Sequence, residues 1–193
     1  MPTTEPIRDL EQLRQLANYF LTQGQYRNHV MVVLGVHSVL RIGDLLSLQW
    51  SDLYDFRKGS FKKRFSLIES KTKKRKTITL HPDAIWALQN LFDHRKNLDS
   101  PYVFSNGHRR DAPINRVQAW RIITTAAKFL HIEGVISCHS LRKTFGYHAA
   151  VEEDIPPALL MEIYNHSDFK TTQMYLGLRQ DELDGAYLGV KLF

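Results

Sequence analysis

The stretch from residue 61 to residue 80 most constrains the fold, because its pattern differs from the sequence on both sides of it. Phe61 to Glu69 and Thr77 to Leu80 are rich in Phe, Ile, Leu and Thr, a composition that favours β-strands. The seven polar residues between them, 70–76, read Ser-Lys-Thr-Lys-Lys-Arg-Lys and are predicted to form a hairpin tip. The fold must therefore accommodate a β-hairpin with a very basic tip.

Apolar residues recur every three or four positions before and after this hairpin, which predicts amphipathic helices. Val30 to Val36 is apolar on all sides, so its helix is expected to lie in the core. Pro82 is predicted to begin a helix and Asn115 to cap another. Tyr102 to Phe104 is expected to supply a third strand. The predicted fold class is α+β, mainly α-helical, with a small three-stranded antiparallel sheet and helices over residues 7–20, 30–36, 42–48, 82–92, 116–130, 138–151, 156–165 and 168–178.

The length of 193 residues suits a single domain, large enough to fold without disulfides or metal. Hydrophobic residues make up 43% and charged residues 24%, which argues against disordered and membrane classes. The lone cysteine, Cys138, rules out a disulfide framework and favours a reducing compartment. Residues 1–6 read as a short tail without a secretory signal, and the longest apolar run, 30–36, is too short to span a bilayer.

The positive charge is concentrated in one segment. Ten basic residues and one acid, Glu69, lie between Arg57 and Lys76, giving +9 where the whole chain carries +6. One interpretation is a solvated hairpin surface. The other is a finger that lies along a phosphate backbone and displaces its counterions.

His139 and Arg142 share one face of a predicted helix, at positions i and i+3. Arg142 borders an apolar stripe, so its guanidinium is expected to be partly desolvated. A phosphate would fit its planar fork in a bidentate way. The alternative is a structural arginine paired with Asp or Glu.

Tyr175 lies about two helical turns after Asp168, a predicted helix cap, and nine positions after His166. By itself this pattern indicates only a partly exposed tyrosine on a helix surface. A single histidine among nine is equally weak evidence.

Four motifs taken together, in this order, resemble the catalytic domain of the tyrosine recombinases, the phage-integrase family. The family pattern Arg-x-Gly-Glu-Leu, then Leu-x-Trp-x-Asp, is matched by Arg41-Ile-Gly-Asp-Leu45 and Leu48-Gln-Trp-Ser-Asp52. His-x-Leu-Arg-His/Lys-Thr-Phe is matched from His139 to Phe145, and Gly-His-Ser followed by Thr-x-x-Tyr is matched up to Tyr175. The resemblance spans roughly residues 8–180.

Two residues depart from this family pattern. Asp44 replaces the commoner Glu and keeps its charge, and Asn165 replaces the Gly that precedes the histidine, where it is expected to alter the turn. Relatives usually carry a further N-terminal domain that clamps DNA. We expect residues 1–193 to form the catalytic domain alone, as a short natural member or as a fragment.

The resemblance implies a DNA strand breaking-and-rejoining enzyme with a 3′-phosphotyrosine intermediate on Tyr175, independent of metal, cofactor and ATP. Arg41 and Arg142 would bind the scissile phosphate, His166 would add a hydrogen bond, and His139 would act as a base or a further phosphate donor. Lys71, which opens a Lys-Thr turn, would protonate the leaving 5′-oxygen, with three neighbouring lysines as alternatives. The residues expected to contact DNA are Lys73, Lys74, Arg75 and Lys76. The histidines are not expected to form a metal-ligand cluster.

The expected partner is double-stranded DNA, with a homotetramer on synapsed sites and no membrane, in the cytoplasm at the nucleoid. The apolar C-terminal segment, 179–193, is expected to dock on a neighbouring subunit or to pack on its own domain. The alternatives are a catalytically silent DNA-binding relative, a type IB topoisomerase-like enzyme, and a helical regulator or hydrolase without a DNA role. The last of these leaves the basic hairpin unexplained.

Overall fold

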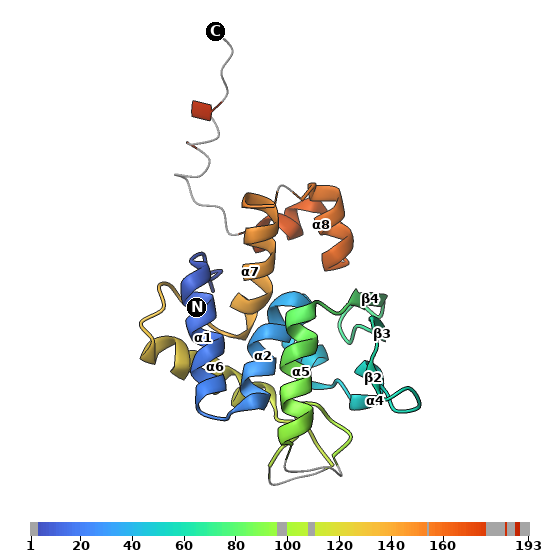
Figure 1. The fold of residues 1–193 in the computed structure, drawn as a ribbon. Helices are drawn as coiled ribbons and strands as arrows, with labels where there is room; N and C mark the ends of the chain where they lie inside the picture. Colours follow the sequence, from blue (N-terminus) through green and yellow to red (C-terminus); the bar gives the residue numbers. More distant parts are fainter. Residues whose placement is uncertain are drawn as a thin grey trace.

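The computed structural model describes residues 4–95, 100–107, 111–153 and 155–176, together with residues 184, 188 and 189. Within these residues the fold is mainly helical with small antiparallel sheets, which confirms the predicted fold class (Figure 1). The elements in chain order are α1 (Leu10–Thr22), α2 (Tyr26–His37), α3 (Ile42–Leu46), α4 (Trp50–Leu53), β1 (Tyr54–Asp55), β2 (Ser60–Phe61), β3 (Arg64–Ile68), β4 (Arg75–Thr79), α5 (Pro82–His94), α6 (Arg116–Phe129), α7 (Cys138–Val151), α8 (Pro157–Tyr164) and α9 (Phe169–Leu176).

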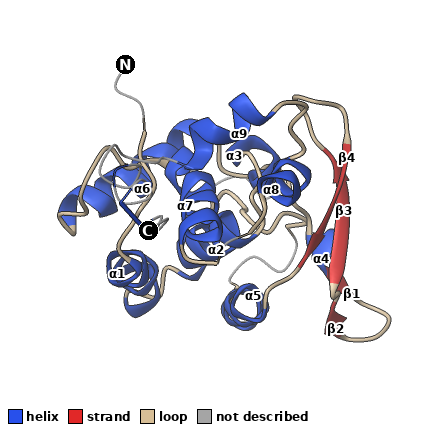
Figure 2. Ribbon diagram, turned by 90° about the horizontal axis from the view of Figure 1, so that it is seen from above, coloured by secondary structure: helices blue, strands red, loops and turns tan. Residues whose placement is uncertain are grey.

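Helix α2 forms the centre of the molecule, as its uniformly apolar sequence predicts. It packs against α1, α5 and α7, which surround it in Figure 2. Val30, Met31 and Leu34 are at most 1% exposed. Arg41 lies in the short link between this buried helix and α3.

The hairpin of β3 and β4 lies at one side of the helices (Figure 2). Its register pairs Arg64 with Thr79 at the open end and Ile68 with Arg75 next to the tip. Phe65 and Ile78 face the core from adjacent strands, since side chains alternate between the two faces of a strand. The tip therefore projects beyond the last pair, as the sequence predicts.

The expected third strand does not form. Tyr102 makes one isolated bridge with Gln49, and the N–H of Val103 donates to the Leu48 carbonyl at 3.0 Å. The 102–104 segment thus pairs with the chain between α3 and α4 rather than with the hairpin. The described residues contain two separate two-stranded sheets, β1–β2 and β3–β4. The first of these and the short helix α4 have no signal in the periodicity of the sequence.

The last helices form a small unit of their own around a second apolar cluster. Ala149 of α7, Leu160 of α8 and Leu176 of α9 are its buried members. This cluster fixes α9, and with it Tyr175, against α7. The tail segment 179–193 lies outside the described residues apart from positions 184, 188 and 189. No helix in the described part of the chain is long and apolar enough to cross a membrane.

Candidate active site

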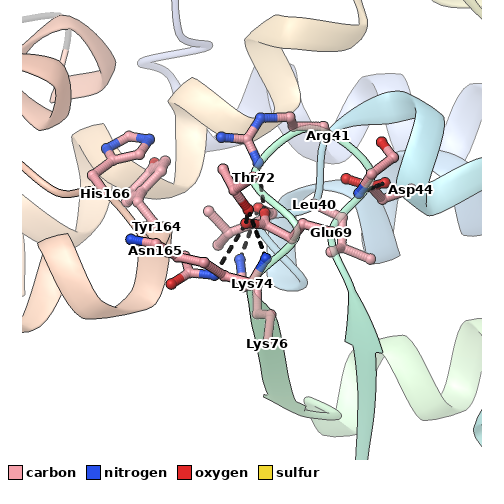
Figure 3. A network of polar contacts seen from close by, with 12 residues as sticks. Leu40, Arg41, Asp44, Glu69, Thr72, Lys74, Lys76, Tyr164, Asn165 and His166 are labelled. Carbon is pink, nitrogen blue, oxygen red and sulfur yellow. Dashed lines mark hydrogen bonds and ion pairs between the residues drawn. The ribbon is translucent and has the colours of Figure 1, made fainter.

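Arg41 caps the N-terminus of α3, immediately after the chain leaves α2. Its carbonyl accepts the N–H groups of Asp44 and Leu45 at 2.9 Å each, which begins the helix. Its guanidinium turns the other way, toward the hairpin, where Nη1 donates to Oε1 of Glu69 at 2.7 Å (Figure 3). The link from α2 to α3 therefore points a cation at the hairpin tip.

Arg142 is buried in the middle of α7 and is only 1% exposed. Its Nη1 donates to the Val39 carbonyl, and its Nη2 donates to the Tyr164 carbonyl at 3.1 Å. Nη2 also lies 3.3 Å from Nε2 of His166, and Nε has no hydrogen-bond partner. Carbonyls and an imidazole, rather than a carboxylate, are thus the partners of this cation among the described residues. The alternative of a structural arginine paired with Asp or Glu does not match these hydrogen bonds.

The Tyr175 ring is enclosed by groups from α7, α8 and the turn after it. Its centroid lies 5.0 Å from the His139 ring and 5.0 Å from the His166 ring. The guanidinium carbon of Arg142 lies 5.2 Å from the same centroid. Gly146 of α7 permits this packing, since a Cβ there would clash with the Tyr164 hydroxyl and would lie 3.1 Å from the Tyr175 carbonyl oxygen.

Both histidines of this cluster are held neutral near pH 7. Burial lowers the pKa of His139 to about 4, with further contributions from Lys143, Arg142, Arg41 and Lys71. Burial also lowers the pKa of His166 to about 4, assisted by Arg142 and Arg41. Burial opposes charge of either sign, whereas the nearby cations Arg41 and Arg142 disfavour only further positive charge and would favour an anion.

The orientation of His166 follows from its two contacts. A guanidinium can only donate, so Nε2 of His166 accepts from Arg142. The protonated Nδ1 then donates to Oγ1 of Thr172 at 3.1 Å, which anchors the ring to α9. His166 therefore joins the arginine of α7 to the helix that carries Tyr175.

Lys71 is exposed at the hairpin tip, and its charge is near enough to lower the pKa of His139. Lys73, Lys74 and Arg75 are also exposed. Lys76 differs from the expectation of a DNA-contacting surface residue, because it is only 7% exposed and its Nζ donates to the Val39 carbonyl at 3.0 Å. Burial and the nearby Arg142 lower the pKa of Lys76 to about 7.

The fold thus gathers the residues singled out from the sequence from four separate places. His139, Arg142, His166 and Tyr175 meet at the junction of α7, α8 and α9, and Arg41 acts electrostatically on Arg142 and on both histidines. Lys71 acts electrostatically on His139 from the hairpin tip. Asn165 adopts the left-handed conformation, with φ 60° and ψ 36°. Gly and Asn both tolerate this conformation, so the presence of Asn does not require a different turn.

A family model described as the phage integrase family matches residues 8–182. The chain belongs to the phage integrase family. This membership confirms the resemblance drawn from the four motifs, and it supports a site-specific recombinase that cleaves and rejoins DNA.

Among curated proteins, the chain is similar to the probable integrase/recombinase YoeC of Bacillus subtilis (strain 168), with 35% identity over 189 residues and 97% of each chain covered. Among solved structures, it is similar to the XerA recombinase, with a TM-score of 0.79 and 20% identity. The XerH site-specific recombinase, bound to its palindromic difH substrate in a post-cleavage complex, gives a TM-score of 0.76 and 16% identity. The alignments cover 98% and 96% of this chain, but only 66% and 52% of those two solved chains.

Three residues of this integrase-family site were not predicted as site residues from the sequence: Val39, Glu69 and Tyr164. Glu69 had a signal, as the single acid in a segment with ten basic residues. Val39 had no such signal, because it contributes its backbone carbonyl, which accepts from Arg142 and Lys76, and not its side chain. Tyr164 is fully buried, and its hydroxyl donates to the Arg142 carbonyl at 2.7 Å. This hydrogen bond ties the end of α8 to the backbone of α7 at Arg142.

A second polar cluster contains His37, His81 and Asp83, whose ligand atoms lie within 4.8 Å of one another. The expectation that the histidines form no close ligand cluster is wrong for this group. Its imidazole rings are stacked in parallel, however, with centroids 4.1 Å apart and an interplanar angle of 4°. Since the nitrogen lone pairs lie in the ring planes, they do not converge on one ion in this arrangement. Nδ1 of His81 also accepts the Asp83 N–H at 3.2 Å.

Proposed function

We propose that this chain cuts and rejoins double-stranded DNA by site-specific recombination, with Tyr175 as the nucleophile. The observation that carries the proposal is the convergence of Arg142, two neutral histidines and Tyr175, with Arg41 in electrostatic contact. A guanidinium beside the tyrosine ring and a second one close enough to interact with it electrostatically have the chemistry needed to hold a phosphodiester beside a phenol oxygen.

In the proposed reaction, the Tyr175 oxygen attacks the scissile phosphorus and the bond to the 5′-oxygen breaks. This gives a 3′-phosphotyrosine and a free 5′-hydroxyl. A second 5′-hydroxyl then reverses the step on a new strand. The energy of the phosphodiester bond is retained in the adduct, so neither ATP nor a cofactor is required.

Each residue of the cluster has a role in this step. Arg41 and Arg142 stabilise the negative charge that develops on the non-bridging oxygens, and fixed donors of this kind are worth about 3–4 kcal/mol each. Neutral His139, beside the phenol ring, accepts its proton or donates to the phosphate. His166 accepts from Nη2 of Arg142 and so orients the guanidinium, whose Nε has no partner among the described residues and can donate to the phosphate. Lys71 gives a proton to the leaving 5′-oxygen, which typically contributes about 10²–10⁴-fold.

The exposed residues Lys73, Lys74 and Arg75 would lie along the phosphate backbone next to the cleaved strand. We expect a homotetramer on two synapsed sites, with integration or excision of a mobile element as the process. Action on chromosomal DNA implies a place in the cytoplasm at the nucleoid. The DNA-bound state of XerH, which has the same fold, supports double-stranded DNA as the substrate.

A covalent trapping assay tests this function. The protein is incubated with nicked suicide duplexes from its own genomic neighbourhood, with and without EDTA, and quenched with detergent. The DNA is then digested, and mass spectrometry locates the nucleotide adduct. We expect it on Tyr175 in both buffers. The variant Tyr175→Phe should bind the duplex normally without forming the adduct, and Tyr19→Phe on α1 is the matched control.

An adduct that persists in Tyr175→Phe would remove Tyr175 as the nucleophile. Salt-sensitive DNA binding without any adduct would favour a silent DNA-binding relative. Relaxation of supercoiled plasmid without exchange between two sites would favour a topoisomerase-like activity.

A further inference from the structure

Glu69 is a carboxylate with no exposed surface, at the end of β3 where the hairpin tip begins (Figure 3). Three side chains donate to it. Arg41 reaches Oε1 at 2.7 Å, while Thr72 and Asn165 reach Oε2 at 2.7 and 3.1 Å. A buried carboxylate is stable only when it is paired and hydrogen-bonded, so these contacts fix its position and theirs.

The three donors belong to separate parts of the site. Arg41 begins α3, Thr72 follows Lys71 in the hairpin tip, and Asn165 precedes His166 at the end of α8. Glu69 thus links the hairpin tip, which carries Lys71, to Arg41 on one side and to the turn that carries His166 on the other. Backbone groups of the tip add further hydrogen bonds, among them those from the Ser70 N–H to Asp44 Oδ1 and from the Lys73 N–H to the Glu69 carbonyl, both at 2.9 Å.

Asn165 contributes to this junction through its side chain and not only through its backbone. Its left-handed conformation would suit glycine equally well. Glycine, which the family pattern carries at this position, has no amide to donate to Glu69. The Asn165–Glu69 hydrogen bond is therefore a contact that the usual motif cannot make.

We infer that Glu69 is a positioning residue that fixes the Lys71 tip against Arg41 and against the His166 turn, with Asn165 as the second anchor. This inference rests on the proposed function, in which Lys71 protonates the leaving oxygen. A general acid must lie within hydrogen-bond reach of that oxygen, and a misplacement of about 1 Å can cost about a hundredfold in rate. Glu69 itself touches neither substrate nor reacting atoms in this scheme.

A first readout needs no catalysis. Glu69→Gln keeps the shape of the side chain and removes its charge, while Asn165→Gly keeps the left-handed turn and removes the amide. Limited trypsin digestion, read by mass spectrometry, reports cleavage after Lys71, Lys73, Lys74 and Arg75. We expect cleavage there about fivefold faster or more in both variants, the change expected when one hydrogen bond is lost. The exposed Glu153→Gln variant is the control and should match the wild type.

A second readout asks which step Glu69 serves. A duplex with sulfur in place of the scissile 5′-oxygen releases a thiolate, which leaves without a proton. We expect Glu69→Gln to form the Tyr175 adduct about a hundredfold more slowly than wild type on ordinary DNA. On the sulfur-containing duplex it should come close to the wild-type rate, as should Lys71→Ala. Asn165→Gly should show a smaller defect with the same rescue.

Unchanged trypsin cleavage in Glu69→Gln, or an equal defect on both duplexes, would overturn the inference. Failure of sulfur to rescue Lys71→Ala would overturn it as well, because Lys71 would then not be the acid. If the wild type forms no adduct on either duplex, the proposed function fails. The trypsin experiment would still decide whether Glu69 and Asn165 hold the tip.

Discussion

Arg142 has a structural role in the fold, and the proposed function gives the same side chain a chemical one. Its guanidinium donates to the carbonyls of Val39 and Tyr164, which come from the α2–α3 link and from the end of α8. The same group lies beside the Tyr175 ring. Because two buried carbonyl oxygens accept from it, we expect its removal to affect folding as well as the proposed cleavage.

Two substitutions separate these roles. Arg142→Ala should abolish detectable adduct formation and lower the free energy of unfolding by about 1–3 kcal/mol, since the Tyr164 carbonyl loses its side-chain donor and the Val39 carbonyl loses one of its two. Arg142→Lys keeps the charge and one donor but not the planar fork, so it should recover much of the stability and little of the cleavage. Urea unfolding and suicide-duplex trapping measure the two effects. An Arg142→Lys variant with wild-type cleavage would show that bidentate binding is not required.

Val39 is the residue that sequence patterns were least able to identify. It is β-branched yet has a φ of 53°, a conformation that such residues rarely adopt. In this conformation the Val39 carbonyl accepts hydrogen bonds from both Arg142 and Lys76. Unusual backbone conformations tend to gather at functional sites, and this one directly precedes Leu40 and Arg41.

At the scale of elements, the helices and the hairpin follow from the sequence. Helix α7 has the predicted bounds, and Asn115 caps α6 through its side chain. The β1–β2 pair and α4 were missed because elements of two to four residues show no periodicity. Strand alternation does place Lys76 on the same face as Ile78, so its burial could have been predicted. The contacts of Glu69 could not, because its partners come from distant parts of the chain.

The basic residues of the hairpin tip and of the start of β4 differ in exposure, and DNA binding can test this difference. Lys73, Lys74 and Arg75 are exposed, whereas Lys76 faces inward. Replacing the first three together with Gln should reduce the slope of log K against log salt by roughly 2 to 3 units, since each phosphate contact contributes about 0.9. Lys76→Met should leave the slope unchanged. Fluorescence anisotropy at several salt concentrations measures both, and equal slopes in the wild type and the triple variant would remove the tip from the DNA interface.

Over the whole molecule, several histidines are held neutral by the fold. His37, at the end of α2, resembles the two histidines around Tyr175, because burial and its neighbour His81 lower its pKa to about 4. These histidines lie in different elements, so protonation is unfavourable in more than one part of the folded chain. Solution pH is therefore linked to folding as a whole and not only to the active site.

Stability should fall as the pH drops from about 6.5 toward 4. In this window histidines of the unfolded chain, with a pKa of about 6.5, take up protons that the folded chain resists until about pH 4, so the unfolded state binds more protons. Urea midpoints at pH 7, 6 and 5 measure the effect while most carboxylates remain charged. His37→Gln should flatten the pH dependence without touching the Tyr175 cluster, and exposed His94→Gln should not. A midpoint that stays constant from pH 7 to pH 5 would mean that the folded chain accommodates charged imidazoles at these sites.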